Sequence, residues 1–376
     1  MDPVRFIPPL YEQRYEFVKA YVEAHKPKKV ADLGCSECTL LHKLKFRDCI
    51  EELVGVDIDE EILRRKGHTL TPLPFHYLDP LERSLSVTLY HGSVTEKDPA
   101  LLGFDLITCI ELIEHLEAKD LEQFQDVLFG FMAPKAVVIS TPNVEFNVLF
   151  SEKTRFRHPD HKFEWSRKEF QSWAVKISRQ YNYTVEFTGV GKAEPETKDV
   201  GYCSQIGIFR KNYNESEESI NNKKGHRSVY KRVLHVVYPS IQDEKYLRKV
   251  VLRNALSHAD RLKNNFLRTL FPEKEEENEN MADNESNSCG VSRWVSSFQT
   301  PIENEENKVK PPFLEGDAIH VPLETLFAIP KVKKLCGGLD VLQRMMNGEI
   351  LLSSDGSAVV YPLHREDDLD SDMGDA

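Results

Sequence analysis

The sequence predicts an α/β fold in which a mostly parallel, seven-stranded sheet is covered by helices on both faces. Two observations indicate it. Up to about residue 211, short and nearly all-apolar runs alternate with amphipathic stretches. Hydrophobic residues make up 40% of the chain, which is enough for a sizeable core. Sheets of this kind bind their ligands at the carboxyl ends of the strands.

The strands and helices of this series alternate regularly along the chain. The predicted strands are Lys29–Leu33, Leu53–Asp57, Val87–His91, Phe104–Cys109, Ala136–Ser140, Tyr183–Val190 and Ser204–Phe209. The predicted helices are Thr39–Phe46, Asp59–Lys66, Leu121–Phe131 and Trp165–Gln180. Only a short stretch with glycine and proline separates the last two strands, so we expect them to form an antiparallel pair at the sheet edge.

The composition changes near residue 211, which divides the chain into a domain of residues 1–211 and a region of residues 212–376. In the second region Glu273–Asn287 is acidic and of low complexity, and the tail after residue 364 is acidic again. Such runs bury almost nothing and usually stay disordered. We therefore expect a largely disordered, acidic C-terminal region, in which Val229–Val251 and Val321–Leu352 dock back or form small helices.

Composition and charge exclude several classes of protein. The longest apolar runs are far shorter than the roughly 20 residues of a membrane helix, so we expect no membrane association. The start, MDPVRFIPPLYEQRY, lacks the basic and apolar regions of a secretion signal. Seven cysteines, an odd number, suit reduced thiols in the cytosol or nucleus. A net charge of -12 excludes a bulk nucleic-acid coat, although a local basic strip can still bind RNA.

Residues at the ends of the first three strands form a candidate cofactor site. After Asp32 the chain turns through Gly34 toward a helix, whose first N–H groups have no intrahelical partner. Asp57 ends the second strand, where a carboxylate can accept both ribose hydroxyls of an adenosine-containing cofactor. Ser93 follows the third strand, where a short polar side chain can meet the adenine edge. The alternative is that Gly34 is only a turn and Asp57 only a helix N-cap.

The glycine pattern distinguishes between two kinds of cofactor. A dinucleotide-binding loop would have glycine at the positions of Ser36 and Thr39, and only Gly34 is present, which counts against a pyrophosphate cofactor. The pattern D-x-G, followed by an acid at the end of the second strand, resembles instead the Rossmann-like, or class I, S-adenosylmethionine-dependent methyltransferases. This resemblance implies S-adenosylmethionine as the cofactor.

The fourth strand runs into a candidate metal site. Glu111, Glu114 and His115 are spaced at i, i+3 and i+4, so on a helical turn they would project from one face beside the cofactor site. Two carboxylates and an imidazole can hold Mg²⁺, Mn²⁺ or Zn²⁺. The alternative is that the acids are solvated on a helix and that the histidine packs against the core.

The segment after the fifth strand can fold back over the same pocket. It supplies His161 as a candidate fourth ligand, with Asp160 and Glu164 as partners that would orient the imidazole. Lys153–Arg179 is also locally basic, with eight Lys/Arg against three acids and interleaved aromatic residues, which suits a single-stranded backbone and stacked bases. The alternative for its later part is an amphipathic helix with a solvated basic face and core aromatics. The aromatics are Phe156, Phe163, Trp165, Phe170 and Trp173.

E-x-x-E-H at residues 111–115 together with D-H-K-F-E-W at residues 160–165 is a specific pair of motifs. DLGCSECTLL, STPNVEFN, VEFTGVG and GYCSQIGIF accompany them. With these motifs, residues 11–210 resemble the small-RNA 3′-terminal 2′-O-methyltransferases, the Hua-enhancer family, and specifically its shorter animal members.

The resemblance implies roles for individual residues. Asp57 and Ser93 would touch the methyl donor, and Arg157 stands where the family has a basic residue near the RNA. The residues that match the family's ligands for a divalent metal, here Mg²⁺ or Mn²⁺, are Glu111, Glu114, His115 and His161. His115 or His161 would additionally assist proton removal, although one imidazole nitrogen cannot serve metal and proton at once.

The implied reaction moves a methyl group to a ribose 2′-hydroxyl, which is a poor nucleophile at neutral pH. A divalent ion lowers the pKa of a bound hydroxyl and fixes its position. Chelation of both vicinal hydroxyls would restrict the reaction to the 3′-terminal nucleotide, because only that nucleotide has both groups free. By resemblance we expect the substrates to be single-stranded Piwi-interacting RNAs, whose ends the methyl group would protect.

The same resemblance predicts the setting of the reaction. We expect a Piwi or Argonaute-type partner that presents the RNA, a monomeric enzyme, and a cytoplasmic location with germline RNA granules as a candidate site. Two other functions stay open from the residues alone. One is a small-molecule methyltransferase that uses no metal, and the other is a non-catalytic adaptor that binds RNA.

Overall fold

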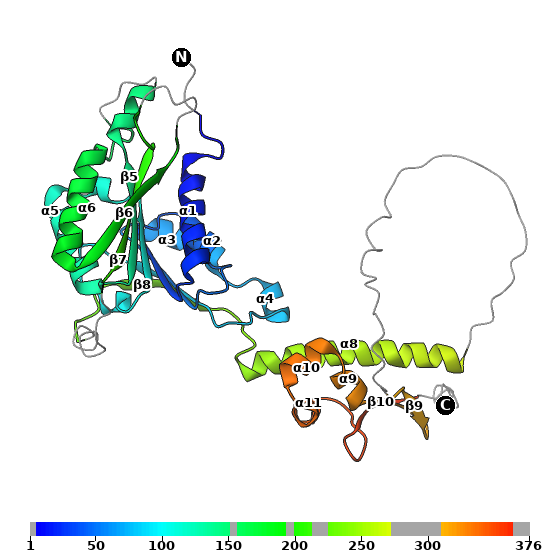
Figure 1. Cartoon of the computed structure of the whole chain (residues 1–376). Helices are drawn as coiled ribbons and strands as arrows, with labels where there is room; N and C mark the ends of the chain where they lie inside the picture. Colours follow the sequence, from blue (N-terminus) through cyan, green and yellow to red (C-terminus); the bar gives the residue numbers. More distant parts are fainter. Residues whose placement is uncertain (1–4, 151–155, 193–198, 213–224, 272–309, 364–376) are drawn as a thin grey trace, which may run out of the picture. The chain divides into compact units, whose positions relative to one another are not determined.

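The structure is a computed structural model that describes residues 5–150, 156–192, 199–212, 225–271 and 310–363 (Figure 1). The chain divides into two units, Met1–Asp243 and Glu244–Ala376, and each is described by itself. None of the helices in the described ranges combines the length and the apolar character needed to cross a membrane.

The first unit is built around one sheet, which in the described residues has eight strands in the order β6-β7-β5-β4-β1-β2-β3-β8. The five parallel strands are β1 (Lys29–Leu33), β2 (Glu52–Asp57), β3 (Ser86–His91), β4 (Leu106–Ile110) and β5 (Ala136–Pro142). The antiparallel strands are β6 (Tyr183–Val190), β7 (Ser204–Lys211) and β8 (Lys231–Val237). All five parallel strands point their carboxyl ends to one edge of the sheet.

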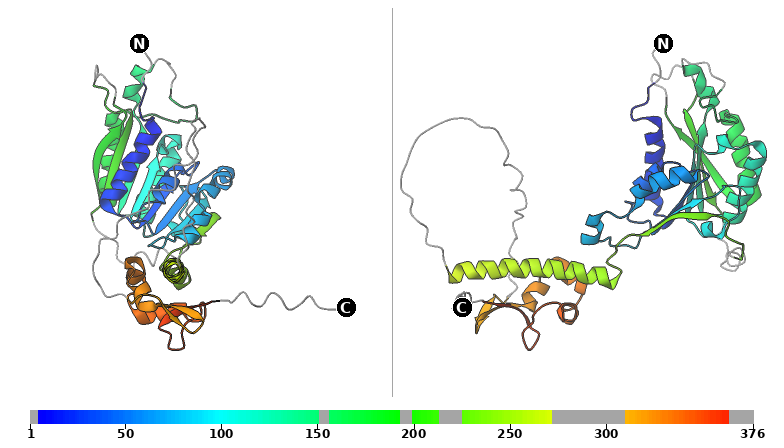
Figure 2. Two further views of the ribbon diagram at one scale, coloured as in Figure 1. Left: turned by 90° about the vertical axis from the view of Figure 1, so that its right-hand side faces the viewer. Right: turned by 180° about the vertical axis from the view of Figure 1, so that it is seen from behind.

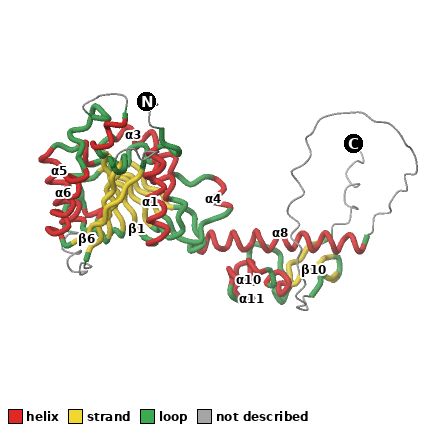
Figure 3. Tube along the Cα trace, turned by 45° about the horizontal axis from the view of Figure 1, so that its top comes forward, coloured by secondary structure: helices red, strands yellow, loops and turns green. Residues whose placement is uncertain are grey.

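Helices cover both faces of the sheet, as Figures 1 and 3 show. One face carries α1 (Leu10–His25), α2 (Thr39–Leu44) and α3 (Glu60–Lys66), and the other carries α5 (Ala118–Gln125) and α6 (Arg167–Tyr181). A short helix, α4 (Pro74–Leu78), precedes β3. Each face has its own apolar cluster, with Val18 and Leu41 in one and Phe124 and Phe170 in the other. Burial on both faces explains why the central strands are nearly all-apolar.

Local sequence signals set the ends of α6. Ser166 caps its first turn, accepting a hydrogen bond from the Glu169 N–H, and the Glu169 carboxylate in turn accepts from the Ser166 N–H. Asn182 ends the helix in a left-handed conformation, with φ of 61°. The helix α5 differs from the prediction, because a π-helical segment, Asp126–Met132, continues it into the next loop.

The predicted α/β class, the parallel strands and the antiparallel edge pair are confirmed, but the predicted count of seven strands is one short. The eighth strand, β8, comes from beyond residue 211 and pairs antiparallel with β3. Helix α1 was not predicted at all. Only three of its residues, Val18, Tyr21 and Val22, are buried, so its apolar stripe is narrow.

A buried carboxylate explains why the first unit extends to Asp243 and not to residue 211. Asp98 is fully buried, and its Oδ2 accepts hydrogen bonds from the N–H groups of Val229 (2.6 Å) and Tyr230 (2.8 Å) and from the Ser228 hydroxyl. This anchor fixes the chain directly before β8. The sequence boundary was placed too early because the polar stretch before Ser228 hid a strand that completes the sheet.

The second unit is a small α+β arrangement with its own core. Its long helix α8 (Glu244–Leu270) packs against α9 (Leu323–Phe327), α10 (Pro330–Cys336) and α11 (Leu339–Met346). A three-stranded antiparallel sheet is formed by β9 (Phe313–Glu315), β10 (Ala318–Pro322) and β11 (Ala358–Pro362). Figure 2 shows these elements in two further views.

The described parts of residues 212–376 are more ordered than the sequence predicts. Val229–Val251 supplies β8 and the start of α8, a single helix of 27 residues, and Val321–Leu352 supplies three helices and the last two residues of β10. The prediction was that these apolar pieces dock back or form small helices. Val251 and Val321 lie in one core although they are 70 positions apart in the chain. The acidic Glu273–Asn287 and the acidic tail lie outside the described residues.

Replacing Asp98 by alanine should lower the free energy of unfolding by about 3 kcal/mol, because it leaves the N–H groups of residues 229 and 230 without their acceptor. Urea unfolding of the two proteins measures the difference. Glu122, exposed on α5, serves as the control, and its replacement by alanine should change stability by less than about 0.5 kcal/mol. Equal stability of wild type and the Asp98 variant would contradict the anchoring role.

Candidate functional site

The predicted cofactor residues lie at the carboxyl edge of β1, β2 and β3. Asp57 ends β2, and its two oxygens accept hydrogen bonds from the backbone N–H of Ser36 (2.7 Å) and of Asp59 (2.9 Å). The carboxylate thus holds the loop after β1 in place. Each oxygen keeps a further lone pair, so a pair of ribose hydroxyls can still bind there.

The loop after β1 passes close to the end of β4, which requires glycine at position 34. Gly34 has φ of +73°, and a β-carbon there would lie 2.8 Å from Cδ1 of Leu112. Asp32 is buried beneath this turn and accepts a hydrogen bond from the Thr108 hydroxyl (2.6 Å). Burial raises the pKa of Asp32 to about 7, although the Thr108 hydrogen bond acts in the opposite direction.

Ser93 lies after β3, and its hydroxyl bonds to the Thr95 hydroxyl (2.7 Å). The ring of Tyr230 lies against the turn that contains Ser93, and its hydroxyl donates a hydrogen bond to the Ser93 carbonyl (3.0 Å). A β-carbon on Gly92 would lie 2.2 Å from that ring. The segment before β8 therefore shapes the wall beside Ser93, a contribution that residues 1–211 alone would not have revealed.

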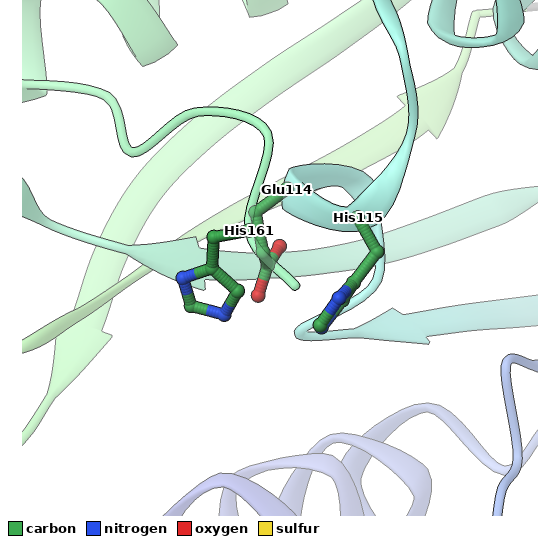
Figure 4. Close-up of side chains that lie close together, drawn as sticks. All are labelled: Glu114, His115 and His161. Carbon is green, nitrogen blue, oxygen red and sulfur yellow. The ribbon is translucent and has the colours of Figure 1, made fainter. Parts of the chain in front are cut away.

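Three of the four predicted metal ligands converge at the neighbouring strand ends. Glu114 and His115 come from the short helical turn after β4 (Ile113–His115), and His161 comes from the segment after β5. Ligand atoms of these three residues all lie within 4.8 Å of one another, and their side chains are drawn in Figure 4. The Lys162 N–H donates to the Glu114 carbonyl (2.7 Å), which ties the two segments together.

The Glu114 side chain is fully buried and only half satisfied. Its Oε2 accepts a hydrogen bond from the Thr141 hydroxyl (3.0 Å), whereas no described residue donates to its Oε1. Burial, together with the nearby Glu111 carboxylate, raises the pKa of Glu114 well above its ordinary value. An orphaned, buried carboxylate oxygen beside two imidazoles fits a divalent cation, which would supply the missing partner and the missing charge.

The two histidines are prepared as ligands in different ways. Nδ1 of His161 lies 2.7 Å from Oε1 of Glu164, and Glu164 also accepts from the Asn147 amide (2.7 Å). A carboxylate on Nδ1 fixes the ring and directs Nε2 toward the cluster. Partial burial, followed by the neighbouring His161 and His158 rings, lowers the pKa of His115, so its imidazole is neutral at neutral pH. Asp160, the other expected partner, lies near His158 instead.

Glu111 does not belong to the cluster in the structure. Its backbone has a left-handed conformation, with φ of 53°, and not the helical turn that the spacing predicted. Its carboxylate accepts hydrogen bonds from the Ser140 and Ser204 hydroxyls and pairs with Arg14 (3.3 Å). A non-glycine residue in this conformation at a strand end is typical of functional sites. Its role as a ligand stays a prediction.

Arg157 is directed into the protein. The guanidinium of Arg157 donates to the carbonyls of Asn143 and Cys203 (2.8 Å for Cys203) and to the Asn147 side chain. The backbone N–H of Arg157 donates to the Glu164 carboxylate (2.6 Å). These bonds hold together the segments on either side of His161. The predicted contact between Arg157 and RNA stays a prediction, and in the structure the residue positions the neighbours of His161.

The basic strip differs from the expected RNA surface. Arg167 pairs with Glu145 (2.8 Å) and Asp199 (3.1 Å), and Lys162 with Glu117 (3.4 Å). The aromatic rings after residue 162 pack on one another and against the core, which favours the amphipathic-helix alternative. These rings are Phe163, Trp165, Phe170 and Trp173. Lys153 and Arg155 lie outside the described residues.

Several residues of the site were missed from the sequence. Thr141, Ser140 and Ser204 donate to the two glutamates, and Arg14 reaches Glu111 from helix α1. The serine and threonine at the end of β5 lie at a strand terminus, which is a signal that sequence reasoning could have used. Arg14 carries no such signal, because its proximity to Glu111 depends on how α1 packs.

Comparisons with known proteins show which proteins this chain resembles. The family model described as the HENMT1 C-terminal domain matches residues 245–363. The small RNA 2′-O-methyltransferase of Xenopus tropicalis is 58% identical over 361 residues, which cover 96% of this chain and 98% of that protein. The protein of the same name from Gallus gallus is 48% identical over 365 residues, covering 97% and 96% of the two chains.

One solved structure supports the fold of the first unit. The crystal structure of the small RNA methyltransferase HEN1 matches with a TM-score of 0.53 and 33% sequence identity. The match covers 64% of this chain and 28% of that chain.

Replacing His161 by alanine should weaken Mn²⁺ binding at least tenfold, because one of three converging ligand atoms is lost. Replacing Glu164 by glutamine should weaken it less, since the ring stays but its orienting carboxylate does not. Calorimetric titration with Mn²⁺ measures both effects. His68, whose ring bonds to the Arg65 carbonyl away from the cluster, is the control. Unchanged Mn²⁺ affinity in the His161 variant would contradict the metal site.

Proposed function

The chain belongs to the small RNA 2′-O-methyltransferases, the Hua-enhancer family, and we propose that it methylates the 2′-hydroxyl of the 3′-terminal nucleotide with the help of a divalent metal. S-adenosylmethionine is the methyl donor of this fold class, and the substrates are single-stranded small RNAs. One observation carries the metal-dependent mechanism: Glu114, His115 and His161 converge beside the strand ends that carry Asp32 and Asp57.

Some residues of the site would bind the metal ion or the methyl donor, and others orient these binding residues. Glu114, His115 and His161 would hold Mg²⁺ or Mn²⁺, with Glu111 close by. Such an ion would lower the pKa of the ribose hydroxyl and fix its position. Glu164 keeps Nε2 of His161 directed at the site, and Thr141 fixes one oxygen of Glu114. Asp57 and the loop at Gly34 would hold the donor, so that the methyl group faces the hydroxyl.

Selection of the RNA end follows from the chemistry of the terminal ribose. Only the last nucleotide has both its 2′- and 3′-hydroxyls free, and both are needed to chelate one ion. An internal nucleotide lacks the second oxygen and would bind poorly. The metal site formed by Glu114, His115 and His161 would therefore select the 3′ end of the RNA strand, whatever the RNA sequence.

The biological substrate and setting are part of the same proposal. The resemblance to the animal members supports Piwi-interacting RNAs, presented by a Piwi or Argonaute-type protein to a monomeric enzyme. The same resemblance supports a cytoplasmic location, with germline RNA granules as a candidate site.

Replacing Asp57 by alanine should weaken binding of S-adenosylhomocysteine about a hundredfold, because two hydrogen bonds to a carboxylate are lost and the Ser36 loop loses its anchor. Calorimetry with purified protein measures this. Asp59 is the matched control on the same turn, because its side chain caps α3 and does not face the loop after β1. Equal losses in the two variants would contradict a direct role of Asp57.

Methyl transfer should require a free 2′,3′-diol and a metal ion. With labelled S-adenosylmethionine, a short single-stranded RNA that ends in a diol should be labelled, whereas the same RNA with a 3′-phosphate or a 2′-deoxy end should not. EDTA should abolish labelling, and added Mn²⁺ should restore it. Equal labelling of all ends would refute end selection by the metal, and activity in EDTA would favour a metal-free methyltransferase.

A further inference from the structure

Helix α8 of the second unit carries a row of basic side chains at every fourth position. The row, called the α8 basic row below, consists of Lys245, Lys249, Arg253 and Arg261, with Ser257 at the position between the last two. All five side chains are exposed. In an α-helix, residues four positions apart are neighbours on the surface, so these side chains form one continuous line.

The charge of α8 is unusual for this protein. The helix contains seven Lys/Arg and two acids, although the whole chain has a net charge of -12. The rest of the second unit that is described, residues 310–363, has five basic and six acidic residues. Seven of the twelve Lys and Arg residues in the described part of this unit therefore lie on α8.

The other side of α8 is buried in the core of the second unit. Val251, Ala255 and Ala259 lie in that core together with residues of α9, α10 and α11. In Figure 1 these helices and β10 lie along one side of α8. Two basic residues outside the row have structural partners: Arg248 donates to the Met345 carbonyl (2.8 Å), and the Lys263 ammonium lies over the ring of Tyr361 (4.6 Å). The row lies on the exposed side of the helix, as does Arg268. Within the row, the Lys245 ammonium lies 5.7 Å from the centre of the Tyr246 ring, and the Arg261 guanidinium lies 2.6 Å from a ring nitrogen of His258.

Helix stability does not explain the α8 basic row. Like charges at i and i+4 destabilise a helix, by about 0.2–0.5 kcal/mol for each pair. Lys245, Lys249 and Arg253 form two such pairs, and no acidic residue stands three or four positions from any of them in the sequence. Solubility does not require them either, because the chain already carries a large net charge of the opposite sign.

We propose that the α8 basic row binds the phosphate backbone of the small RNA, away from the 3′-terminal nucleotide. The inference rests on the proposed function, which supplies a single-stranded polyanion as substrate. Four residues advance a helix by about 6 Å, and the row from Lys245 to Arg261 spans about 24 Å. Regularly spaced cations over this length match a polymer with regularly spaced anions. The Ser257 hydroxyl can donate to a phosphate within the same line.

RNA fits the row better than an acidic protein does. Protein surfaces seldom present carboxylates at one regular interval over such a length, whereas every nucleotide carries a phosphate. The α8 basic row contains no aromatic ring for base stacking, so the contact should not depend on sequence. It would add affinity for the body of the strand and leave the chemistry at its end unchanged.

The test uses the full-length chain with glutamine in place of three residues of the row, K249Q/R253Q/R261Q. Glutamine keeps helix propensity. The matched control is K331Q/K333Q/K334Q, which removes three exposed charges from α10 of the same unit. Two diol-ended RNAs are compared, one of about 25 nucleotides and one of about five. Methyl transfer and RNA binding are measured at several salt concentrations, and thermal unfolding confirms that the proteins are folded.

For the long RNA, the K249Q/R253Q/R261Q variant should have a KM about tenfold higher than wild type and an unchanged kcat. The logarithm of its association constant for RNA should fall less steeply with the logarithm of the salt concentration, with a slope smaller by about 2. For the five-nucleotide RNA, kcat and KM should both stay as in wild type. An unchanged KM and slope for the long RNA would overturn the inference and leave the row to another partner, such as an acidic protein. An equal effect of the α10 control would overturn it too. Loss of activity on the short RNA would instead concern the proposed function.

Discussion

Glu114 places a carboxylate in the interior of the protein, with one oxygen bonded by Thr141 and the other without a donor among the described residues. An ionised carboxylate in this position is costly, so the site favours either a proton or a cation. The surrounding side chains suit a cation. The imidazoles of His115 and His161 would supply nitrogen ligands to such a cation, and Glu164 fixes the ring of His161 in orientation.

The site depends on joining two segments that are distant in the chain. The turn after β4 supplies Glu114 and His115, and the loop after β5 supplies His161. A hydrogen bond from the Lys162 N–H to the Glu114 carbonyl connects them, and a bridge between Asn143 and Trp165 joins the two ends of the segment after β5. Arg157 holds the segment after β5 in place through the carbonyls of Asn143 and Cys203. The ligand geometry is therefore a property of the loops, which the rigid sheet holds at one edge.

The sequence predicts a residue's place in the fold best where that place is a strand end. The ends of β1, β2 and β4 located Asp32, Asp57 and Glu114, because parallel strands bring their carboxyl ends together. The prediction failed where the outcome depends on packing between distant parts. Glu111 was expected to join Glu114, His115 and His161 in one cluster, but its carboxylate contacts Ser140, Ser204 and Arg14. The strand β8 was hidden because its anchor, Asp98, is more than a hundred residues earlier in the chain.

The pairing of β8 with β3 also bears on how the protein folds during its synthesis. The hydrogen-bonded residues Thr88 and His235 of these strands are 147 positions apart. While the ribosome makes the residues between them, β3 is an uncovered edge strand whose backbone groups can pair with another chain. Nascent chains should thus be prone to aggregate until β8 emerges, and a chaperone that shields this edge would raise the yield of native protein.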